Sequence, residues 1–421
     1  MDATRGNAPD TQRAQREMAL MRAYPTAMDL RARARRRMPR FAFEYMDGGA
    51  GDDTGIRRNW NALDAVELAP RYGRVVSPPA CGVTLFGKSY SAPTGVSPIG
   101  GPGTAYPGAE TYLARAAQAH RIPYTLGVLS GVDVETAAAM APDVLWFQLY
   151  RFHRDNHRIG LDLARRAAAA GAQALVLTID TPIRTVRPRE TKSGIVNPFK
   201  LTMKLRLDAL TSPWWLAAML RNGIPRFASL TPYMKPSPTI AEAAEFIRRE
   251  SGGAFTWDEI AHYREVWRGP LILKGVLHPS DARKALALGV DGLFVTNHGG
   301  RQIEALPAPI DALPAIAREV GGKATLIFDS GVRNGVDVAR AVALGADAAF
   351  AGKAFLWSLG ALGPEGPGHL MRVLTEDLRA TLGQLGCFNV GDLRGVARRH
   401  PGAWSAGEYA SGINTDFGPP D

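Results

Sequence analysis

The sequence has few cysteines and no long apolar run. Cys81 and Cys387 are the two cysteines among 421 residues, and neither stands in a CxxC or CxxH spacing. A disulfide framework is therefore excluded, and no metal site is expected. No apolar run reaches the roughly 18 residues of a membrane-spanning helix, and the first residues lack the apolar segment of a secretory signal. We expect a cytoplasmic protein, either dissolved or bound peripherally to the inner face of a membrane.

The charge balance is basic, but the sequence gives no nucleic-acid motif. The formal net charge is +10, from 50 basic and 40 acidic side chains. Part of the excess lies in residues 31–37, a helix-like segment whose arginines we interpret as a solvated face. Zinc-finger spacing, an aromatic RNP pattern and a basic zipper are all missing from the sequence. Nucleic acid is therefore not an expected partner.

Eight short apolar or β-branched runs alternate with alanine-rich stretches that have helical character. This alternation is typical of a parallel sheet wrapped by helices, and eight units favour a closed (β/α)8 barrel. No GxGxxG follows the first run, which argues against a dinucleotide-binding sheet. The predicted strands are 94–99, 124–129, 145–150, 174–180, 271–276, 292–296, 325–329 and 348–352.

The predicted barrel domain covers residues 25–395 and begins with a helical extension. Residues 1–24 are expected to be a flexible N-terminus, and residues 396–421 a C-terminal tail. About ninety residues separate the fourth and fifth predicted strands, so an insertion at about 190–265 is expected there.

Part of this insertion, residues 200–234, combines basic residues with large apolar ones. The basic members are Lys200, Lys204, Arg206, Arg221 and Arg226, and the apolar ones are Trp214, Trp215, Leu216, Met219 and Leu220. Such a mixture is typical of an amphipathic helix at a membrane surface. A lid packed over an active site has the same composition, and the sequence leaves both interpretations open.

The segment Thr296–Gln302, of sequence TNHGGRQ, directly follows Gly292–Val295, a run typical of a buried strand. Loops at the carboxyl ends of barrel strands build the active site, and glycines there let the backbone approach a flat ligand. His298 is placed to take a proton, while Arg301 can grip a carboxylate through two parallel N–H bonds. Oxidation of a 2-hydroxy acid needs this division of labour.

Six motifs in order resemble those of the FMN-dependent L-2-hydroxy acid oxidase and dehydrogenase family, which includes glycolate oxidase, L-lactate dehydrogenase and mandelate dehydrogenase. The resemblance covers roughly residues 25–394. The motifs are FEYMDGGA at 43–50, WFQLY at 146–150, LTIDTP at 177–182, LKGV at 273–276, NHGGRQ at 297–302 and DSGVR at 329–333.

The resemblance implies FMN lying across the strand ends of the barrel. The flavin phosphate is expected near the seventh and eighth strands, where Lys353 replaces the arginine more common in the family. Gly127 likewise stands where relatives carry a serine. The residues implied to bind FMN are Pro98, Ile99, Gly100, Gln148, Thr178, Lys274, Asp329, Ser330, Gly331, Arg333, Gly352 and Lys353.

The resemblance also assigns the substrate residues. Arg301 and Arg189 are expected to hold the carboxylate, with Arg187 as a rival to Arg189 because the segment 183–190 is longer than in glycolate oxidase. Tyr45 and Tyr150 are expected to hydrogen-bond the substrate. His298 is the expected base, and Asp180 is expected to orient it.

The implied function is oxidation of an L-2-hydroxy acid, lactate-sized or larger, to the 2-oxo acid. Leu129 lies near a position where glycolate oxidase carries tryptophan, which favours a larger substrate. Quinone, oxygen or another acceptor fits the motifs, and so do carbanion and hydride mechanisms. A homo-oligomer, tetramer or octamer, is implied by the family. Two rival functions remain: a non-redox barrel enzyme acting on a phosphorylated substrate, and a barrel that binds flavin without catalysis.

Overall fold

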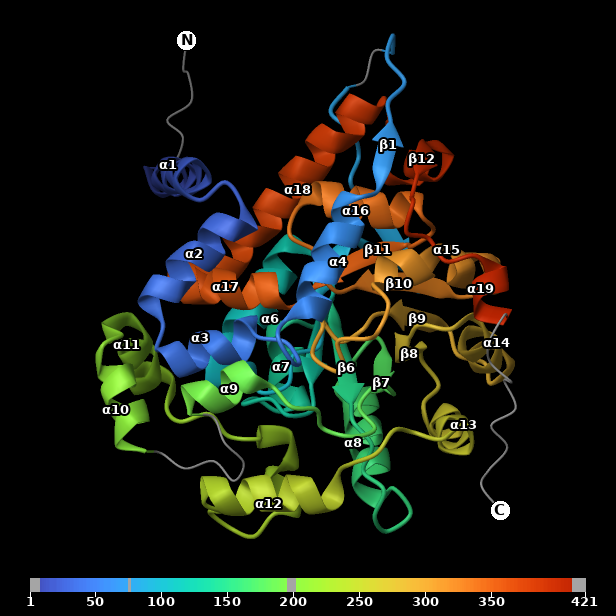
Figure 1. Cartoon of the computed structure of the whole chain (residues 1–421). Helices are drawn as coiled ribbons and strands as arrows, with labels where there is room; N and C mark the ends of the chain where they lie inside the picture. The colour runs from blue at the N-terminus through green and yellow to red at the C-terminus, as the bar shows by residue number, and fades with distance from the viewer. Residues whose placement is uncertain (1–7, 75–76, 195–201, 411–421) are drawn as a thin grey trace.

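Eight parallel strands form a closed barrel in the computed structural model (Figure 1), which describes residues 8–74, 77–194 and 202–410. The strands are β4 (Thr94–Val96), β5 (Tyr124–Gly127), β6 (Leu145–Leu149), β7 (Leu175–Thr178), β8 (Leu271–Val276), β9 (Gly292–Val295), β10 (Thr325–Asp329) and β11 (Ala348–Ala351). Hydrogen bonds between β11 and β4 close the ring. The predicted (β/α)8 barrel is confirmed. Several strands end one to three residues before their predicted limits, and the polar residues beyond those ends lie in loops.

Large side chains fill the barrel interior. Trp146, Phe294 and Phe350 are fully buried, and the ring of Phe350 lies 5.3 Å from each of the other two. Gly95 makes room for this layer, because a Cβ there would stand 2.5 Å from the Phe350 ring. The helices around the strands are α5 (Pro102–Ala105), α6 (Ala109–His120), α7 (Val134–Met140), α8 (Arg158–Ala169), α14 (Pro279–Ala287), α15 (Pro309–Val320), α16 (Gly335–Ala343), α17 (Lys353–Leu362), η2 (Gly363–Glu365) and α18 (Gly366–Leu385).

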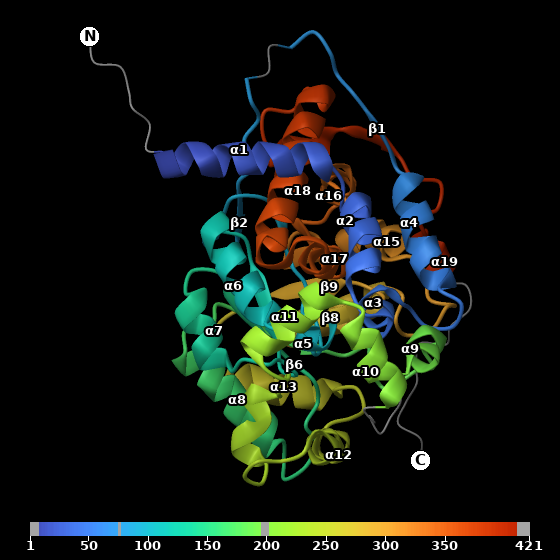
Figure 2. The same ribbon diagram turned by 90° about the vertical axis from the view of Figure 1, so that its left-hand side faces the viewer.

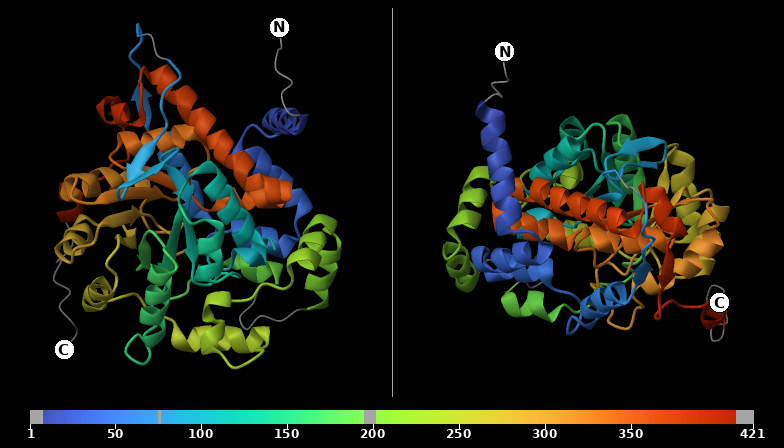
Figure 3. Two further views of the ribbon diagram at one scale, coloured as in Figure 1. Left: turned by 180° about the vertical axis from the view of Figure 1, so that it is seen from behind. Right: turned by 90° about the horizontal axis from the view of Figure 1, so that it is seen from above.

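A hairpin of β2 (Val83–Leu85) and β3 (Lys88–Tyr90) covers the N-terminal end of the barrel, seen from behind in Figure 3. Its turn residue Phe86 packs edge-on against Trp146 at 5.6 Å, and the Trp146 indole donates a hydrogen bond to the Tyr90 hydroxyl. This end is therefore plugged, and ligands must enter from the opposite end, where the strands finish.

The N-terminal extension is helical: α1 (Ala8–Ala23), α2 (Ala27–Arg37), α3 (Arg40–Asp47) and α4 (Thr54–Asp64). Residues 8–23, part of the N-terminal segment expected to be flexible, thus form a helix. Helix α1 crosses α18 (Figure 2), where Arg16 pairs with Glu365 at 2.8 Å and Arg372 with Glu17 at 2.7 Å.

The C-terminal tail also differs from expectation, because part of it is folded. After η3 (Val390–Gly395), strand β12 (Ala397–Arg399) pairs with β1 (Glu67–Ala69), and α19 (Ala406–Ala410) follows. The right-hand view of Figure 3 shows α19 at the margin of the molecule.

The long insertion after β7 folds into short helices beside the open end of the barrel. They are α9 (Pro188–Ser193), α10 (Met203–Leu210), α11 (Pro213–Asn222), η1 (Ala228–Tyr233), α12 (Ile240–Glu250) and α13 (Trp257–Val266). Trp215 anchors α11, since it is buried, donates to the Ala105 carbonyl at 2.9 Å and meets Phe41 edge-on. Lys200, part of the predicted amphipathic segment, lies outside the described residues.

Candidate active site

The loop after β9 carries three consecutive residues with left-handed backbone conformation. They are His298 (φ 60°), Gly299 (φ 66°) and Gly300 (φ 72°). A Cβ on Gly300 would stand 2.8 Å from the backbone nitrogen of Ile56, so only glycine fits against α4. The tight turn brings His298 and Arg301 to the same cavity at the end of the barrel.

His298 and Asp180 form a partly buried pair, with side chains 17% and 11% exposed. The Nδ1 atom of His298 lies 3.1 Å and 3.2 Å from the two carboxylate oxygens of Asp180. The Asp180 backbone is held by Gln302, whose amide donates to its carbonyl. A carboxylate on Nδ1 fixes the ring and leaves Nε2 as the proton acceptor. The predicted base and its orienting partner are thus in direct contact.

Burial sets the protonation of this pair. It lowers the pKa of His298 below its usual value, an effect that the negative charge of Asp180 only partly offsets. Burial raises the pKa of Asp180, but the charges of His298 and Lys274 outweigh it, so the pKa of this carboxyl falls below its usual value. Near neutral pH the site therefore holds a neutral imidazole beside an ionised carboxylate.

Arg301 is fixed by three acceptors. Its Nη1 donates to the carbonyls of Tyr45 and Gly48, each at 2.9 Å, and its Nη2 donates to Glu190 at 2.5 Å. The guanidinium also lies 5.5 Å from the Tyr45 ring centre. Arg301 is therefore a rigid cation at the mouth of the site.

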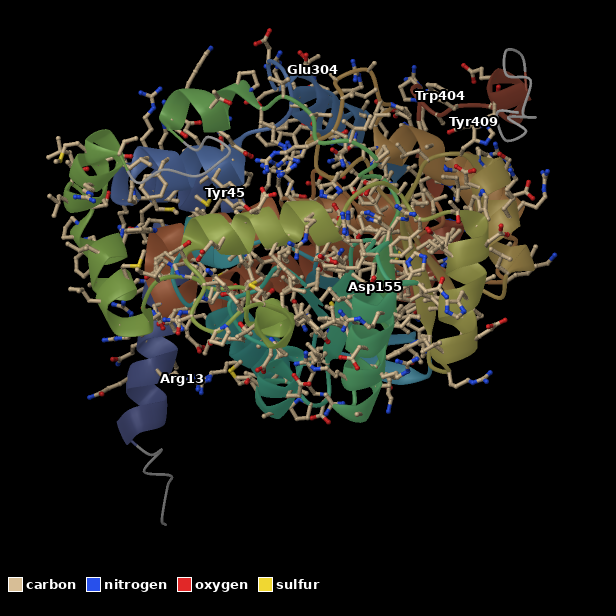
Figure 4. The ribbon with its side chains drawn as sticks, turned by 90° about the horizontal axis from the view of Figure 1, so that it is seen from below. Arg13, Tyr45, Asp155, Glu304, Trp404 and Tyr409 are labelled. Atoms are coloured by element: carbon tan, nitrogen blue, oxygen red, sulfur yellow. The ribbon has the colours of Figure 1, made fainter. Side chains whose placement is uncertain are left out.

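Two tyrosines meet close to this arginine. The Tyr45 hydroxyl donates to the Gly100 carbonyl, and a Cβ added at Gly100 would lie 3.5 Å from the Tyr150 hydroxyl. Burial and the charge of Asp180 raise the pKa of Tyr150 to about 12, so its hydroxyl remains a hydrogen-bond donor. Figure 4 labels Tyr45 on α3 at the end of the barrel that carries the site.

The structure places Arg189, the expected second substrate arginine, away from Arg301 and among acidic side chains. Arg189 is engaged by three carboxylates, Glu44 at 2.5 Å, Asp47 at 2.8 Å and Asp53 at 2.6 Å. Helix α9 begins at Pro188, which turns Arg189 toward α3 and α4 and leaves its rival Arg187 beside Arg301, donating to the Arg301 carbonyl at 3.2 Å.

Arg187 also has the electrostatics of a substrate-binding group. Burial, and then the neighbouring charge of Arg301, lower the pKa of Arg187 to about 10, although Glu190 opposes the shift. Burial raises the pKa values of Tyr45 and Tyr150, and the positive charges of Arg301 and Arg187 offset part of this rise.

A cavity at the strand ends is lined by most of the residues implied for the cofactor. Lys274 at the end of β8 lines it and is 3% exposed. His298, Arg301 and Tyr45 line the same cavity. The other predicted cofactor residues on its wall are Pro98, Ile99, Gly100, Asp329, Ser330, Gly331, Gly352 and Lys353.

Three predicted cofactor residues are not on the wall. Gln148 and Thr178 lie buried at the ends of β6 and β7 and hydrogen-bond each other at 2.8 Å. Arg333 turns to Asp64 at 2.7 Å and Asp337 at 3.2 Å. In this structure its guanidinium is committed to these carboxylates.

Lys353 lines the cavity but is bound to the end of α3. Its ammonium donates to the carbonyls of Gly48 at 2.7 Å and Asp47 at 3.2 Å. Burial and the charge of Arg301 hold the pKa of Lys353 well below its usual value.

Sequence reasoning missed the contribution of α4. Asn59 exchanges two amide hydrogen bonds with Asn297, at 2.8 and 2.7 Å, and Trp60 forms part of the cavity wall. The family motifs do not include these residues, and only the folded chain brings α4 to the loop after β9.

Comparison with known proteins identifies the class of this site. The chain belongs to the FMN-dependent dehydrogenase family, whose model matches residues 34–399. A solved structure of a monotopic membrane protein, (S)-mandelate dehydrogenase, is similar at 30% identity and a TM-score of 0.83, covering 88% of this chain and 97% of that one. A mandelate oxidase structure is similar at 32% identity and a TM-score of 0.76, covering 90% and 99%. The resemblance drawn from the motifs and the predicted FMN dependence are confirmed.

The cavity fits FMN in charge and shape. Gly352 precedes α17, a ten-residue helix whose N-terminus offers backbone amides and a positive dipole end for a phosphate. Gly331, at φ 106°, follows Ser330 and packs against α4, where a Cβ would stand 3.0 Å from Leu63. Lys274 also lines the cavity, and its ammonium would stabilise negative charge on a bound flavin.

Proposed function

We propose that the protein oxidises an L-2-hydroxy acid to the 2-oxo acid, with His298 as the base. The observation that supports this most is the contact of His298 with Asp180 at 3.1 Å, since His298 lines the same cavity as Arg301 and Lys274. A non-redox barrel enzyme needs no such combination of base, carboxylate-binding cation and flavin-facing lysine.

In the proposed reaction each residue has one task. Arg301 and Arg187 bind the substrate carboxylate, and the hydroxyls of Tyr45 and Tyr150 orient it. His298 Nε2 takes one proton from the α-carbon or its hydroxyl, and Asp180 stabilises the imidazolium that results. Bound FMN supplies the two-electron acceptor. Exclusion of water by the buried walls strengthens the charge interactions of all these groups.

We propose a substrate with a side chain of lactate size or larger. Leu129 stands beside the turn that bears Gly100 and accepts a hydrogen bond from Gly101 through its carbonyl at 3.0 Å. A leucine at this place leaves more room than an indole. The similar structures are of enzymes named for mandelate, whose side chain is a phenyl ring, and this supports the same direction.

A panel of 2-hydroxy acids tests the function. Purified protein carrying FMN is mixed anaerobically with glycolate, L-lactate, L-2-hydroxyisocaproate and (S)-mandelate, and flavin absorbance near roughly 450 nm is followed. Bleaching by an L acid, with its D enantiomer inactive, supports the proposal. A flavin that no 2-hydroxy acid bleaches would overturn it in favour of a flavin-binding barrel without this catalysis.

We also propose that α10 and α11 touch a membrane, and that a quinone is the electron acceptor. Their outer face exposes large apolar side chains, with Leu220 at 81% and Trp214 at 61%. Met203, Leu207 and Leu210 of α10 are also exposed, and so is Ile224, just after α11. Arg37, whose guanidinium lies over the Trp214 ring at 4.6 Å, adds positive charge suited to anionic lipid. The similar (S)-mandelate dehydrogenase is described as a monotopic membrane protein.

No helix among the described residues is long and apolar enough to span a bilayer. The lid interpretation predicts that the apolar face packs inward over the site. Trp215 does pack inward, but its neighbour Trp214 is exposed. A surface contact, not insertion across the membrane, is therefore the proposed mode.

Sedimentation with anionic vesicles tests this contact. A Trp214→Glu, Leu220→Glu double variant is expected to lose binding, while Tyr72→Glu, which changes a 76% exposed side chain elsewhere, keeps it. Equal sedimentation of all three proteins, or none for the wild type at low salt, contradicts the proposal and favours a lid.

The family resemblance also implies a homo-oligomer, and light scattering of the purified protein measures its oligomeric state.

A further inference from the structure

Glu190 is a buried carboxylate surrounded by arginines. Its side chain is 3% exposed and lies 2.5 Å from Arg301, 3.4 Å from Arg187 and 3.6 Å from Arg184. Glu190 is the third residue of α9, yet among the described residues its carboxylate makes hydrogen bonds and ion pairs with arginines alone. Glu190 therefore forms ion pairs with these arginines and does not cap its own helix.

The charge balance of this group leaves room for one more anion. Three guanidinium groups face one carboxylate, so the local sum is two positive charges. Arg184 is 62% exposed and partly screened by solvent, whereas the other two arginines are at most 17% exposed. A carboxylate that enters the site is attracted by the two buried arginines and repelled by Glu190.

The hydrogen bonds of Arg301 show how it can still take a substrate. Nη1 is used by two backbone carbonyls and Nη2 by Glu190. Its Nε–H has no partner among the described residues. Glu190 thus occupies one part of the guanidinium and leaves the edge that carries Nε–H for another acceptor.

We propose that Glu190 is a positioning residue that orients Arg301 and limits the affinity of the site for carboxylates, so that the 2-oxo acid product can leave. This inference rests on the proposed function. In this role the negative charge of Glu190 weakens carboxylate binding enough for the product anion to leave, while the arginines still bind the substrate anion. Without its negative charge, both acids bind more tightly, while a neutral ligand of the same shape does not.

The test compares an acid with its amide on the holoenzyme. Glu190→Gln keeps an oxygen acceptor for Arg301 but removes the charge. Apparent Kd values for flavin reduction are measured with the acid of the panel that bleaches FMN and with its primary amide, (S)-mandelate and (S)-mandelamide being the first pair. The variant is expected to bind the acid and the 2-oxo product about 3- to 10-fold more tightly, with the amide within twofold of wild type.

Glu44→Gln is the matched control. Glu44 also accepts a hydrogen bond from an arginine, Arg189, at 2.5 Å and is 17% exposed, so the substitution removes the same charge from a similar pair outside the cavity. It is expected to leave the acid-to-amide ratio unchanged. The inference is wrong if Glu190→Gln leaves that ratio unchanged, or if Glu44→Gln alters it equally.

A second variant, Arg184→Gln, tests the inference if the Glu190→Gln protein does not bind FMN. Arg184→Gln removes one exposed positive charge from the same group and is expected to weaken acid binding 2- to 5-fold without affecting the amide. In a stable double variant with Glu190→Gln, acid affinity returns to within twofold of wild type. No effect of Arg184→Gln on the acid overturns the inference. A wild-type flavin that no acid reduces overturns the proposed function instead, so the two failures are distinguishable.

Discussion

His298 Nδ1 lies between the two carboxylate oxygens of Asp180, 3.1 Å from one and 3.2 Å from the other. The pair joins the loop after β9 to the loop after β7, so the base is oriented by a residue that follows β7, on the far side of β8. Replacing Asp180 with Asn keeps the size of the partner but removes the charge that stabilises the imidazolium. We expect kcat to fall by about 10²- to 10³-fold with FMN retained, in stopped-flow reduction. Retention of more than a tenth of the wild-type rate would contradict the role of Asp180.

The pH dependence follows from the burial of His298. Because burial lowers its pKa below the usual value, the neutral base is already dominant at pH 6.5. The acid limb of kcat/KM is therefore expected below pH 6.5, with the rate rising as pH increases and then levelling. Asp180→Asn removes an interaction that raises this pKa, so its limb moves to lower pH. A limb above pH 7 in the wild type, measured with a substrate ionised throughout, would be incompatible with this account.

Arg187, just before α9, and Arg189, inside it, are predicted to have separable roles. Arg187→Met is expected to raise KM roughly 10- to 100-fold, the value of one charge-assisted hydrogen bond, with little change in unfolding. Arg189→Met leaves Asp47, whose side chain is 1% exposed, with one arginine fewer, and is expected to cost about 2 to 4 kcal/mol of stability. Urea unfolding and steady-state kinetics on both variants check this. A raised KM in Arg189→Met together with a loss of stability in Arg187→Met would instead indicate Arg189 as the substrate arginine.

Gly275 is predicted to position Asp180. Its φ of 117° lies at the irregularity between Lys274 and Val276, and a Cβ there would stand 2.5 Å from the Cβ of Asp180. Gly275→Ala must therefore displace that loop. We expect at least a tenfold loss of kcat, beyond any loss of stability, and a shift of the acid limb. Gly171→Ala is the control, since it also has positive φ but open space around it. Equal activity in the two variants would disprove this role.

The barrel was predictable because the strands are short, apolar and separated by helices. Each barrel strand is buried on both faces and is therefore rich in apolar residues, which the sequence shows directly. The contact between His298 and Asp180 was also predictable, since both follow strands whose carboxyl ends meet at one rim.

The remaining details depend on tertiary contacts. The choice between Arg187 and Arg189 is decided by where α9 begins, and Pro188 at its first position sends Arg189 to the carboxylates of α3 and α4. The order of α1 depends on ion pairs with residues more than three hundred positions away, such as Glu365. No local pattern encodes either.

Anaerobic reduction of a His298→Gln variant tests whether His298 is the base. Glutamine retains a polar side chain of similar size but cannot act as the base. We expect a yellow protein with normal FMN content and intact substrate binding, whose flavin is reduced about 10²- to 10⁴-fold more slowly than in the wild type. Reduction within threefold of the wild-type rate would contradict it.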